Sequence, residues 1–260
     1  MKRLLLFAVL VLLVSCEDLF QYSPDEVSPH TVNINDNNIQ RINFENDTLR
    51  IIVFSDIHHA YDELIALVNT LNEKENSHFA IITGDLTNFG LQFEYDRSYD
   101  DLKKLKMPFI AAAGNHDVLA NGQTVFEKMY GKLDFSFMIG AYKFIFLNTN
   151  SREFGFNGRV PNIDFLRAEL ADTNAYVQAV VVGHVPSFDS DFDPALEAEF
   201  RTLVHNGKVN TVLFGHKHSY MLEKYYHDEV NYLVSDDLFD RSYVELKLSG
   251  ESVTFERKFF

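Results

Sequence analysis

The sequence is short of cysteine and has no tryptophan, and its apolar runs are short. Cys16 is the single cysteine among 260 residues, so no disulfide bond can form within the chain. The lack of further thiolates also argues against a structural zinc site built on cysteine. The apolar run at residues 4–14 falls well short of the roughly 20 residues that a membrane-spanning helix needs.

The chain does contain enough apolar material for a folded domain. Hydrophobic residues make up 46% of the sequence and charged residues 23%, which is typical of a globular protein rather than a disordered one. A chain of this length can bury one sizeable core or two small ones. We interpret the 24 phenylalanines as core residues, because large apolar side chains are mostly buried.

The N-terminus has the order of features found in a signal peptide. Lys2 and Arg3 precede the apolar run, which ends at Leu13-Val14-Ser15-Cys16. This ending resembles the lipobox of bacterial lipoproteins, in which the cysteine becomes the lipidated first residue. We therefore expect a lipoprotein signal peptide at residues 1–15 and attachment to the bacterial cell envelope, at the outer membrane, through lipidated Cys16. The alternative is a secretory signal with an incidental cysteine, and the membrane face, periplasmic or external, stays open.

Acidic residues outnumber basic ones by 38 to 23, which gives the chain a formal net charge of −15. Such a surface repels polyanions, so we expect no binding of long nucleic acid, which depends on Lys and Arg side chains. A small phosphate ester remains compatible with this charge, because bound metal ions reverse the electrostatic potential locally.

The pattern of apolar residues divides the chain into a short N-terminal segment and one domain. Residues 16–48 are rich in Ser, Pro, Asn and Asp and are interpreted as a tether, with a strand or two expected within residues 31–44. Residues 49–260 alternate strands with helices and then end in strands alone, which predicts an α/β fold with mixed β-sheets. Strands are expected at 49–54, 79–83, 109–113, 135–139, 142–147, 178–182, 211–214, 220–226, 230–235, 243–248 and 253–259, and helices at 61–71, 91–105, 162–170 and 194–204.

Polar clusters follow five of the predicted strands. Because ligands bind at the carboxyl ends of strands in open α/β sheets, we expect these clusters to meet at one edge. Asp and His together suit borderline divalent ions such as Zn, Mn and Fe. The glycines that begin four of the clusters permit tight turns from strand to loop. The clusters are Asp56-Ile57-His58, Gly84-Asp85, Gly114-Asn115-His116-Asp117, Gly183-His184 and Gly215-His216-Lys217-His218.

In this order the clusters resemble the motifs of the calcineurin-like metallophosphoesterase superfamily. The resemblance covers roughly residues 49–236 and implies a four-layered α/β sandwich with two divalent metal ions (Mn, Fe or Zn) at the sheet edge. It implies that Asp85 bridges the ions. The first ion would be held by Asp56, His58, Asp85 and His218, and the second by Asp85, Asn115, His184 and His216.

The same resemblance implies the reaction and two catalytic residues. The ions would clamp the phosphoryl oxygens and activate water for in-line attack. His116 would stabilise the developing charge or protonate the leaving oxygen, and Asp117 would orient His116 through a direct contact. The implied activity is metal-dependent hydrolysis of a phosphate ester.

Two positions bear on the branch of the superfamily. Asn88 stands where iron-binding phosphatases of the superfamily place a Tyr, and the segment 84–88 is more similar to the class III phosphodiesterase-like branch. Members of that branch often have a second His where this chain has Val185. We therefore expect a phosphodiesterase for small extracytoplasmic substrates. The alternatives are a phosphomonoesterase or nucleotidase with the same site, or a non-catalytic surface-binding lipoprotein.

Two polar residues and five histidines lie outside the predicted ligand set. Asn88 and Arg159 are candidates for binding the phosphate, although a surface or capping role fits them equally well. The remaining histidines are interpreted as surface or packing residues, and His59 is the least certain because it follows the predicted ligand His58. These histidines are His30, His59, His78, His205 and His227.

Overall fold

The structure is a computed structural model that describes residues 27, 31–45, 47–74 and 76–260. The predicted signal peptide, the lipidation site at Cys16 and much of the predicted tether lie outside the described residues. Within the described part, no helix is both long and apolar enough to cross a membrane.

The first sheet has five strands, which are β1 (Leu49–Phe54), β2 (Phe79–Ile82), β3 (Phe109–Ala111), β10 (Ser242–Ser249) and β11 (Ser252–Phe259). Their spatial order is β11-β10-β1-β2-β3. β1, β2 and β3 run parallel, whereas β10 pairs antiparallel with both β1 and β11. The carboxyl ends of the three parallel strands therefore lie at one edge of the sheet.

The second sheet has six strands, which are β4 (Phe135–Ile139), β5 (Tyr142–Phe146), β6 (Gln178–Val182), β7 (Val209–Phe214), β8 (Met221–Glu223) and β9 (Asn231–Val234). Their spatial order is β4-β5-β6-β7-β9-β8. The four middle strands are parallel, and β4 and β8 close the two sides in antiparallel pairs. This mixture of strand directions agrees with the mixed sheets that the sequence predicts.

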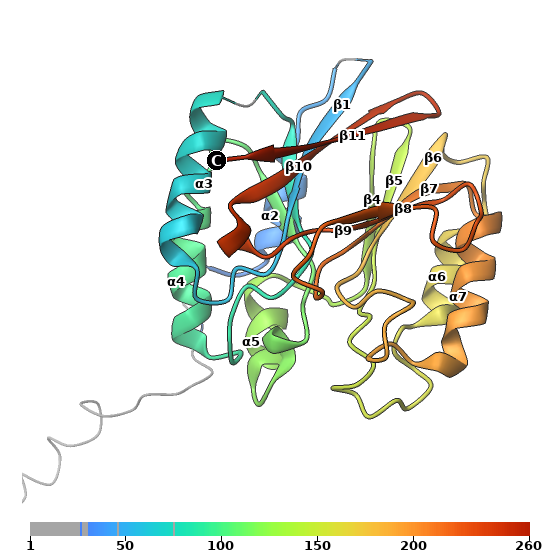
Figure 1. Ribbon diagram of the computed structural model, residues 1–260, viewed down its shortest axis with the longest axis horizontal. Helices are drawn as coiled ribbons and strands as arrows, with labels where there is room; N and C mark the ends of the chain where they lie inside the picture. Colours follow the sequence, from blue (N-terminus) through green and yellow to red (C-terminus); the bar gives the residue numbers. More distant parts are fainter. Residues whose placement is uncertain (1–26, 28–30, 46, 75) are drawn as a thin grey trace, which may run out of the picture.

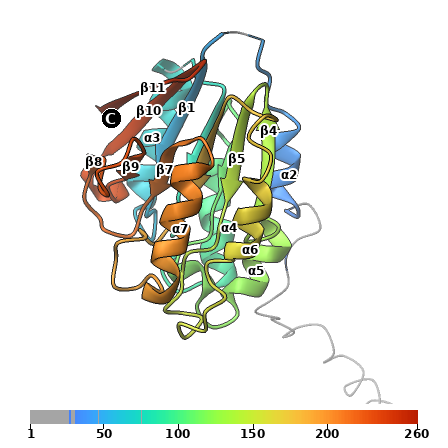
Figure 2. The same cartoon turned by 90° about the vertical axis from the view of Figure 1, so that its right-hand side faces the viewer.

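Helices cover the outer faces of the two sheets, so that the domain has four layers (Figure 1). On the side of the first sheet lie α2 (Ile34–Ile39), α3 (Tyr61–Lys74), α4 (Gln92–Leu102) and α5 (Gly122–Met129). Over the second sheet lie α6 (Ile163–Glu169) and α7 (Pro194–Asn206), as Figure 2 shows. Two short 3-10 turns, η1 (His116–Val118) and η2 (Leu238–Asp240), lie in loops.

The two faces of β1 show why its sequence is apolar at every position except Arg50. Ile51 and Val53 point into the cluster between the two sheets, where Phe144 of β5 is also buried. Ile52 and Phe54 point the other way, into the cluster under the helices of the first sheet. Because successive strand residues face opposite sides, a strand that is covered on both faces reads as a near-continuous apolar run.

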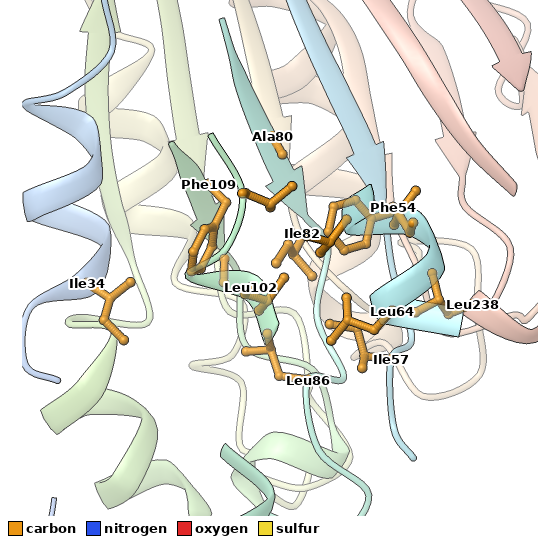
Figure 3. Packing of buried hydrophobic residues seen from close by; sticks show 14 of the residues in the cluster. Ile34, Phe54, Ile57, Leu64, Ala80, Ile82, Leu86, Leu102, Phe109 and Leu238 are labelled. Carbon is orange, nitrogen blue, oxygen red and sulfur yellow. The ribbon is translucent and has the colours of Figure 1, made fainter. Parts of the chain in front are cut away.

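The cluster under α3 and α4 is drawn in Figure 3. Phe54 of β1 and Ile82 of β2 lie over Leu64 of α3, and all three side chains are almost completely buried. Burial of side chains of this size contributes about 1.5–3 kcal/mol each. A third cluster holds α6 and α7 on the second sheet. These three clusters fix the strand ends that carry the polar motifs.

All the strands and helices predicted between residues 49 and 260 are present, with ends that differ by a few residues. The four-layered sandwich is confirmed as well. The structure adds α5, which begins at Gly122 and lies in a segment that the sequence pattern left as a loop. A short helix that begins at a glycine gives little periodic signal.

The strand predicted within residues 31–44 is wrong, because Ile34–Ile39 forms helix α2 instead. α2 docks on β3, the edge strand of the first sheet. The Asn35 amide donates to the carbonyl of Ala111 and accepts from its N–H, both at 2.9 Å, and Asn38 donates to the carbonyl of Phe109 at 2.9 Å. The helix therefore satisfies edge groups of β3 with side chains, which protects an otherwise open edge.

Candidate metal centre

The polar clusters predicted from the sequence come together at the carboxyl ends of β1, β2, β3, β6 and β7. Four groups of Asp and His side chains have ligand atoms within 4.8 Å of one another, and three of these groups consist entirely of residues from the polar clusters. Their members come from loops that are far apart in the sequence, and His58 and His218 of one group are separated by 160 positions. These three groups are Asp56, His58 and His218; His58, Asp85 and His116; and Asp56, Asp85 and His184.

Asp85 lies at the middle of this arrangement and is 1% exposed. Its Oδ2 is 3.4 Å from Nε2 of His58 and 3.2 Å from Nε2 of His184. Its Oδ1 accepts a hydrogen bond from the backbone N–H of His116 at 2.9 Å. One carboxylate oxygen thus faces both halves of the centre, which is the position that a bridging ligand needs.

The two halves have different partners. On one side, Nε2 of His218 lies 3.2 Å from Oδ1 of Asp56 and 3.3 Å from Nε2 of His58. On the other side, Oδ1 of Asn115 lies 3.0 Å from Nε2 of His184 and 3.1 Å from Nδ1 of His216. The structure therefore brings together all the side chains that the resemblance assigns to the two metal ions.

The outward-facing ring nitrogens indicate the tautomers of two of these histidines. Nδ1 of His184 lies 2.8 Å from the carbonyl oxygen of Thr83, and Nδ1 of His218 lies 3.4 Å from Oδ2 of Asp237. When these rings are neutral, donation to these acceptors leaves the inward Nε2 atoms with lone pairs. These lone pairs face the oxygens of Asp85 and Asp56, so a cation between them relieves the repulsion. The donor set of nitrogen and oxygen ligands fits Zn, Mn or Fe.

Charges within the centre shift the pKa of several ligands. Burial raises the pKa of Asp85, but the imidazoles of His184 and His58 outweigh burial and lower the pKa overall. Burial lowers the pKa of His184, but the carboxylate of Asp85 outweighs it and raises the pKa to about 10. Burial lowers the pKa of both His58 and His216. Without metal, His184 is therefore the histidine that is positively charged and faces the carboxylate of Asp85.

The backbone at the centre is strained. Positive φ angles in non-glycine residues are uncommon, and each residue in the left-handed conformation costs about 1–2 kcal/mol. Strain of this kind is concentrated at functional sites in proteins. Five of the predicted ligands adopt it, namely Asp56 (φ 53°), His58 (φ 46°), Asp85 (φ 54°), His216 (φ 73°) and His218 (φ 50°).

The glycines that precede the ligands are needed mainly because neighbouring loops leave no room there for a side chain. Gly84 has a positive φ of 111°. A Cβ at Gly114 would stand 2.1 Å from Oδ1 of Asp85, and a Cβ at Gly215 would stand 2.1 Å from Oγ of Ser55. The turns expected at these glycines are therefore also points where one loop passes directly against another, and a side chain there would displace a ligand.

The orientation of His116 differs from the sequence-based prediction. Nδ1 of His116 lies 2.6 Å from the backbone carbonyl oxygen of Asn88, which fixes the ring. The His116 ring also packs edge-on against His58, with centroids 4.7 Å apart. The expected orienting contact from Asp117 is therefore wrong, and the contact comes from a backbone carbonyl that no side-chain pattern could reveal.

Asp117 joins two loops instead. Its buried carboxylate accepts hydrogen bonds from the N–H groups of Leu86, Thr87 and Gly114 and from the hydroxyl of Thr87, at 2.8–3.1 Å. Burial, followed by the charge of Asp85, raises the pKa of Asp117 to about 7, while the donated hydrogen bonds oppose this rise. Asp117 thus holds the loop of Asp85 against the loop that carries His116.

Two acidic residues after β6 face the outer side of His216, and the sequence motifs did not identify them. Nε2 of His216 lies 3.5 Å from Oδ2 of Asp191 and 3.8 Å from Oδ1 of Asp189. Each carboxylate also holds a cation. Lys217 lies 2.6 Å from Asp189, and Arg152 lies 3.0 Å from Asp191. Both cations bordering His216 are therefore paired.

Thr149, after β5, was also not identified from the sequence. Its hydroxyl accepts hydrogen bonds from the N–H groups of His184 and Val185, both at 2.9 Å. A lone Thr after an apolar strand carries no signal of its own. Thr149 therefore becomes recognisable as a support for His184 once β5 and β6 are known to be neighbours.

The candidates for phosphate binding are placed differently. Asn88 adjoins the centre through its carbonyl, as described above. Arg159 instead lines a separate surface hollow with Asp164 and Arg167 of α6 and Glu199 of α7. His78 is a packing residue as expected, because its Nδ1 accepts from the N–H of Arg50 at the start of β1.

Comparison with known proteins agrees with this geometry. The family model "Calcineurin-like phosphoesterase" matches residues 49–220. A "Probable cyclic nucleotide phosphodiesterase" of Moraxella catarrhalis is 35% identical over 81 residues, which cover 28% of this chain and 29% of that protein. A "Probable glycerophosphodiester phosphodiesterase" of Arcobacter nitrofigilis is 37% identical over 73 residues, covering 28% of this chain and 26% of that protein.

A protein of Vesicomyosocius okutanii, also named "Probable cyclic nucleotide phosphodiesterase", matches over a longer segment. It is 28% identical over 148 residues, which cover 53% of this chain and 61% of that protein. The matches thus span between about a quarter and three fifths of the length of these curated relatives.

Solved structures show the same fold at low sequence identity. A purple acid phosphatase from yellow lupin has a TM-score of 0.64 and 15% identity, covering 83% of this chain and 52% of that one. The protein TT1561 of Thermus thermophilus has a TM-score of 0.57 and 15% identity, covering 80% of this chain and 98% of that one. The family model spans more than half of the chain, so this chain belongs to the calcineurin-like phosphoesterase family.

Proposed function

We propose that this chain is a metal-dependent phosphodiesterase that hydrolyses small phosphodiesters. The observation that carries the choice of diester is the pairing of the cations beside His216, because Lys217 and Arg152 are bound to Asp189 and Asp191. A monoester is dianionic near neutral pH and gains from a free cation. A diester carries a single negative charge, which the two metal ions alone can balance. The names of the sequence relatives support the same choice.

The residues of the centre have separate tasks in this reaction. The side chains around Asp85 would hold two metal ions, which supply Lewis acidity to the phosphoryl group and lower the pKa of water. His116 donates Nδ1–H to the carbonyl of Asn88, which directs its Nε2 away from that loop. Nε2 is then the atom that delivers a proton to the leaving oxygen. Asp117 keeps the Asp85 and His116 loops together.

A panel of aryl esters tests this proposal. The purified protein, loaded with Mn, Zn or Fe, is assayed with bis(p-nitrophenyl) phosphate and with p-nitrophenyl phosphate. The second negative charge of a monoester lacks a free cation, and an interaction between two unit charges near a protein surface reaches about 4 kcal/mol at 4 Å. We therefore expect kcat/KM to be roughly tenfold or more higher for the diester. Equal or faster hydrolysis of the monoester would instead favour a phosphomonoesterase. No hydrolysis at two bound metal ions per chain would favour a non-catalytic binding protein.

We further propose that the enzyme acts outside the cytoplasm and is attached to the cell envelope through lipidated Cys16. The support is the sequence alone, namely the basic start, the short apolar run and the position of the single cysteine. Mass spectrometry of the mature N-terminus tests the attachment. An acylated Cys16 is expected in the native chain, and a Cys16→Ser variant should leave the membrane fraction. A soluble native protein with an unmodified Cys16 contradicts the proposal.

A further inference from the structure

The short turn η2 is fastened to the metal centre and presents a phenylalanine beside it. Oδ2 of Asp237, the residue before the turn, lies 3.4 Å from Nδ1 of His218. The N–H of Leu238 donates to the backbone carbonyl of Asp56 at 3.3 Å. Two predicted ligands thus fix the position of the turn, so Phe239 is held at the edge of the centre on a rigid support.

Phe239 is not needed to fill the core. Its neighbour Leu238 does this, being 1% exposed and lying beside Ile57 and Leu64 (Figure 3). Phe239 itself is 48% exposed. An exposed aromatic ring gives up much of the stabilisation that its burial would contribute. A ring kept in this state next to a reactive centre is suited to contact a ligand.

His59 forms the second part of the same surface. Its ring lies edge-on to Phe239, with ring centroids 5.3 Å apart and planes inclined by 61°. His59 is exposed and directly follows the predicted ligand His58. The two rings come from separate loops next to the same half of the centre. His59 follows the ligand His58, and Phe239 stands two positions after Asp237, which contacts His218.

A third exposed ring lies on the loop that orients His116. Phe89 follows Asn88, whose carbonyl meets Nδ1 of His116, and it is 56% exposed. Exposed phenylalanines thus occur on two separate loops next to the half of the centre that contains His58 and His116. Aromatic rings recognise flat apolar groups by stacking or edge-on contact.

We propose that Phe239 and His59 form a subsite for a flat aromatic substituent of the phosphodiester. This inference rests on the proposed phosphodiesterase function and specifies the substrate class. The metal ions would bind the phosphate, while the two rings contact the esterified group that stays on the phosphorus when the leaving group departs. A favourable aromatic contact corresponds to roughly a two- to tenfold change in affinity.

Binding measurements test the subsite without turnover. Phenylphosphonate and methylphosphonate share a phosphonate group and differ in the aromatic ring, and their affinities for the metal-loaded protein are measured by calorimetry. Phe239→Ser should weaken phenylphosphonate roughly two- to tenfold and leave methylphosphonate unchanged. Phe239→Tyr should retain the native ratio. Met138→Ser is the matched control, because Met138 is 41% exposed and lies near the end of β4, away from the carboxyl ends of the parallel strands that carry the centre.

Kinetics provide the second measurement. Bis(p-nitrophenyl) phosphate and methyl p-nitrophenyl phosphate release the same leaving group but differ in the remaining substituent. For Phe239→Ser we expect a raised KM with the first ester, an unchanged kcat, and unchanged constants with the second.

Two results distinguish failure of this inference from failure of the proposed function. An unchanged preference for the aromatic ligand in Phe239→Ser, or equal weakening of both ligands, overturns the subsite. Absence of diester hydrolysis by the native protein overturns the proposed function, whereas the phosphonate comparison still decides the subsite.

Discussion

Replacing Asp85 or His116 by alanine should separate metal binding from proton transfer, because the two side chains meet the centre differently. Oδ2 of Asp85 is 3.4 Å from His58 and 3.2 Å from His184, so its loss removes a ligand from both halves. The His116 ring is held by the carbonyl of Asn88 instead. We therefore expect Asp85→Ala to lose at least one metal ion per chain and all measurable activity, and His116→Ala to keep both ions.

The size of the His116 effect should depend on the leaving group. General acid catalysis typically contributes about 10²- to 10⁴-fold to the rate. A weakly basic leaving group such as p-nitrophenolate needs little help from a proton, whereas an alkoxide from a glycerophosphodiester needs it strongly. His116→Ala should therefore reduce kcat by roughly 10²-fold or more for the alkyl ester and by much less for the aryl ester.

The assay combines elemental analysis of the purified variants with kcat for the two kinds of ester. His205→Ala is the control, because His205 is an exposed histidine in the last turn of α7. Equal loss of metal in Asp85→Ala and His116→Ala would show that His116 binds metal. Equal rate losses for both leaving groups would show that His116 transfers no proton to the leaving oxygen.

Three further predictions concern the support of the centre and the edge of the first sheet. Gly114→Ala should lower the free energy of unfolding by about 1–3 kcal/mol and reduce the metal content, since the new Cβ would stand 2.1 Å from Oδ1 of Asp85. A native metal content in this variant contradicts the prediction. Metal binding at pH 7 should release about one proton, because the pKa of about 10 keeps His184 protonated without metal and a histidine ligand must be neutral. Metal affinity should therefore rise with pH. Calorimetry in buffers of different ionisation enthalpy measures the proton release, and identical binding heats in these buffers refute it. Asn35→Ala should lower the free energy of unfolding by about 1–3 kcal/mol, because both buried groups of Ala111 lose their partner, and urea unfolding with an unchanged midpoint would count against it.

The strands and the convergence of the ligands could be predicted because both depend on local sequence. A strand such as β1 is buried on both faces, and its apolar run ends at the residue where the loop to Asp56 begins. Parallel strands then place successive loops at one edge. The ligand types, Asp and His, carry the chemistry in their side chains. No long-range information was needed for these inferences.

The remaining features depend on contacts between distant segments. Helix α2 has the polar sequence INDNNI and no apolar periodicity, and it is held by the edge of β3. The carbonyl of Asn88 that orients His116 belongs to the backbone, so residue identity does not reveal it. Asp191 and Asp237 become partners of His216 and His218 when separate loops pack together. Sequence patterns cannot place such partners because they report one segment at a time.

The edge contact made by α2 also has a consequence for biogenesis. The hydrogen bonds from Asn35 and Asn38 to β3 span 76 and 71 positions, so the helix is synthesised well before the strand that it covers. The helix is therefore available to cover the edge of β3 as soon as that strand has emerged, before the edge can pair with a second chain. A chain truncated to begin at residue 49 would keep every predicted metal ligand and lack this cover. We expect such a chain to self-associate, which makes residues 31–44 an internal safeguard of solubility as well as a connection to the N-terminus.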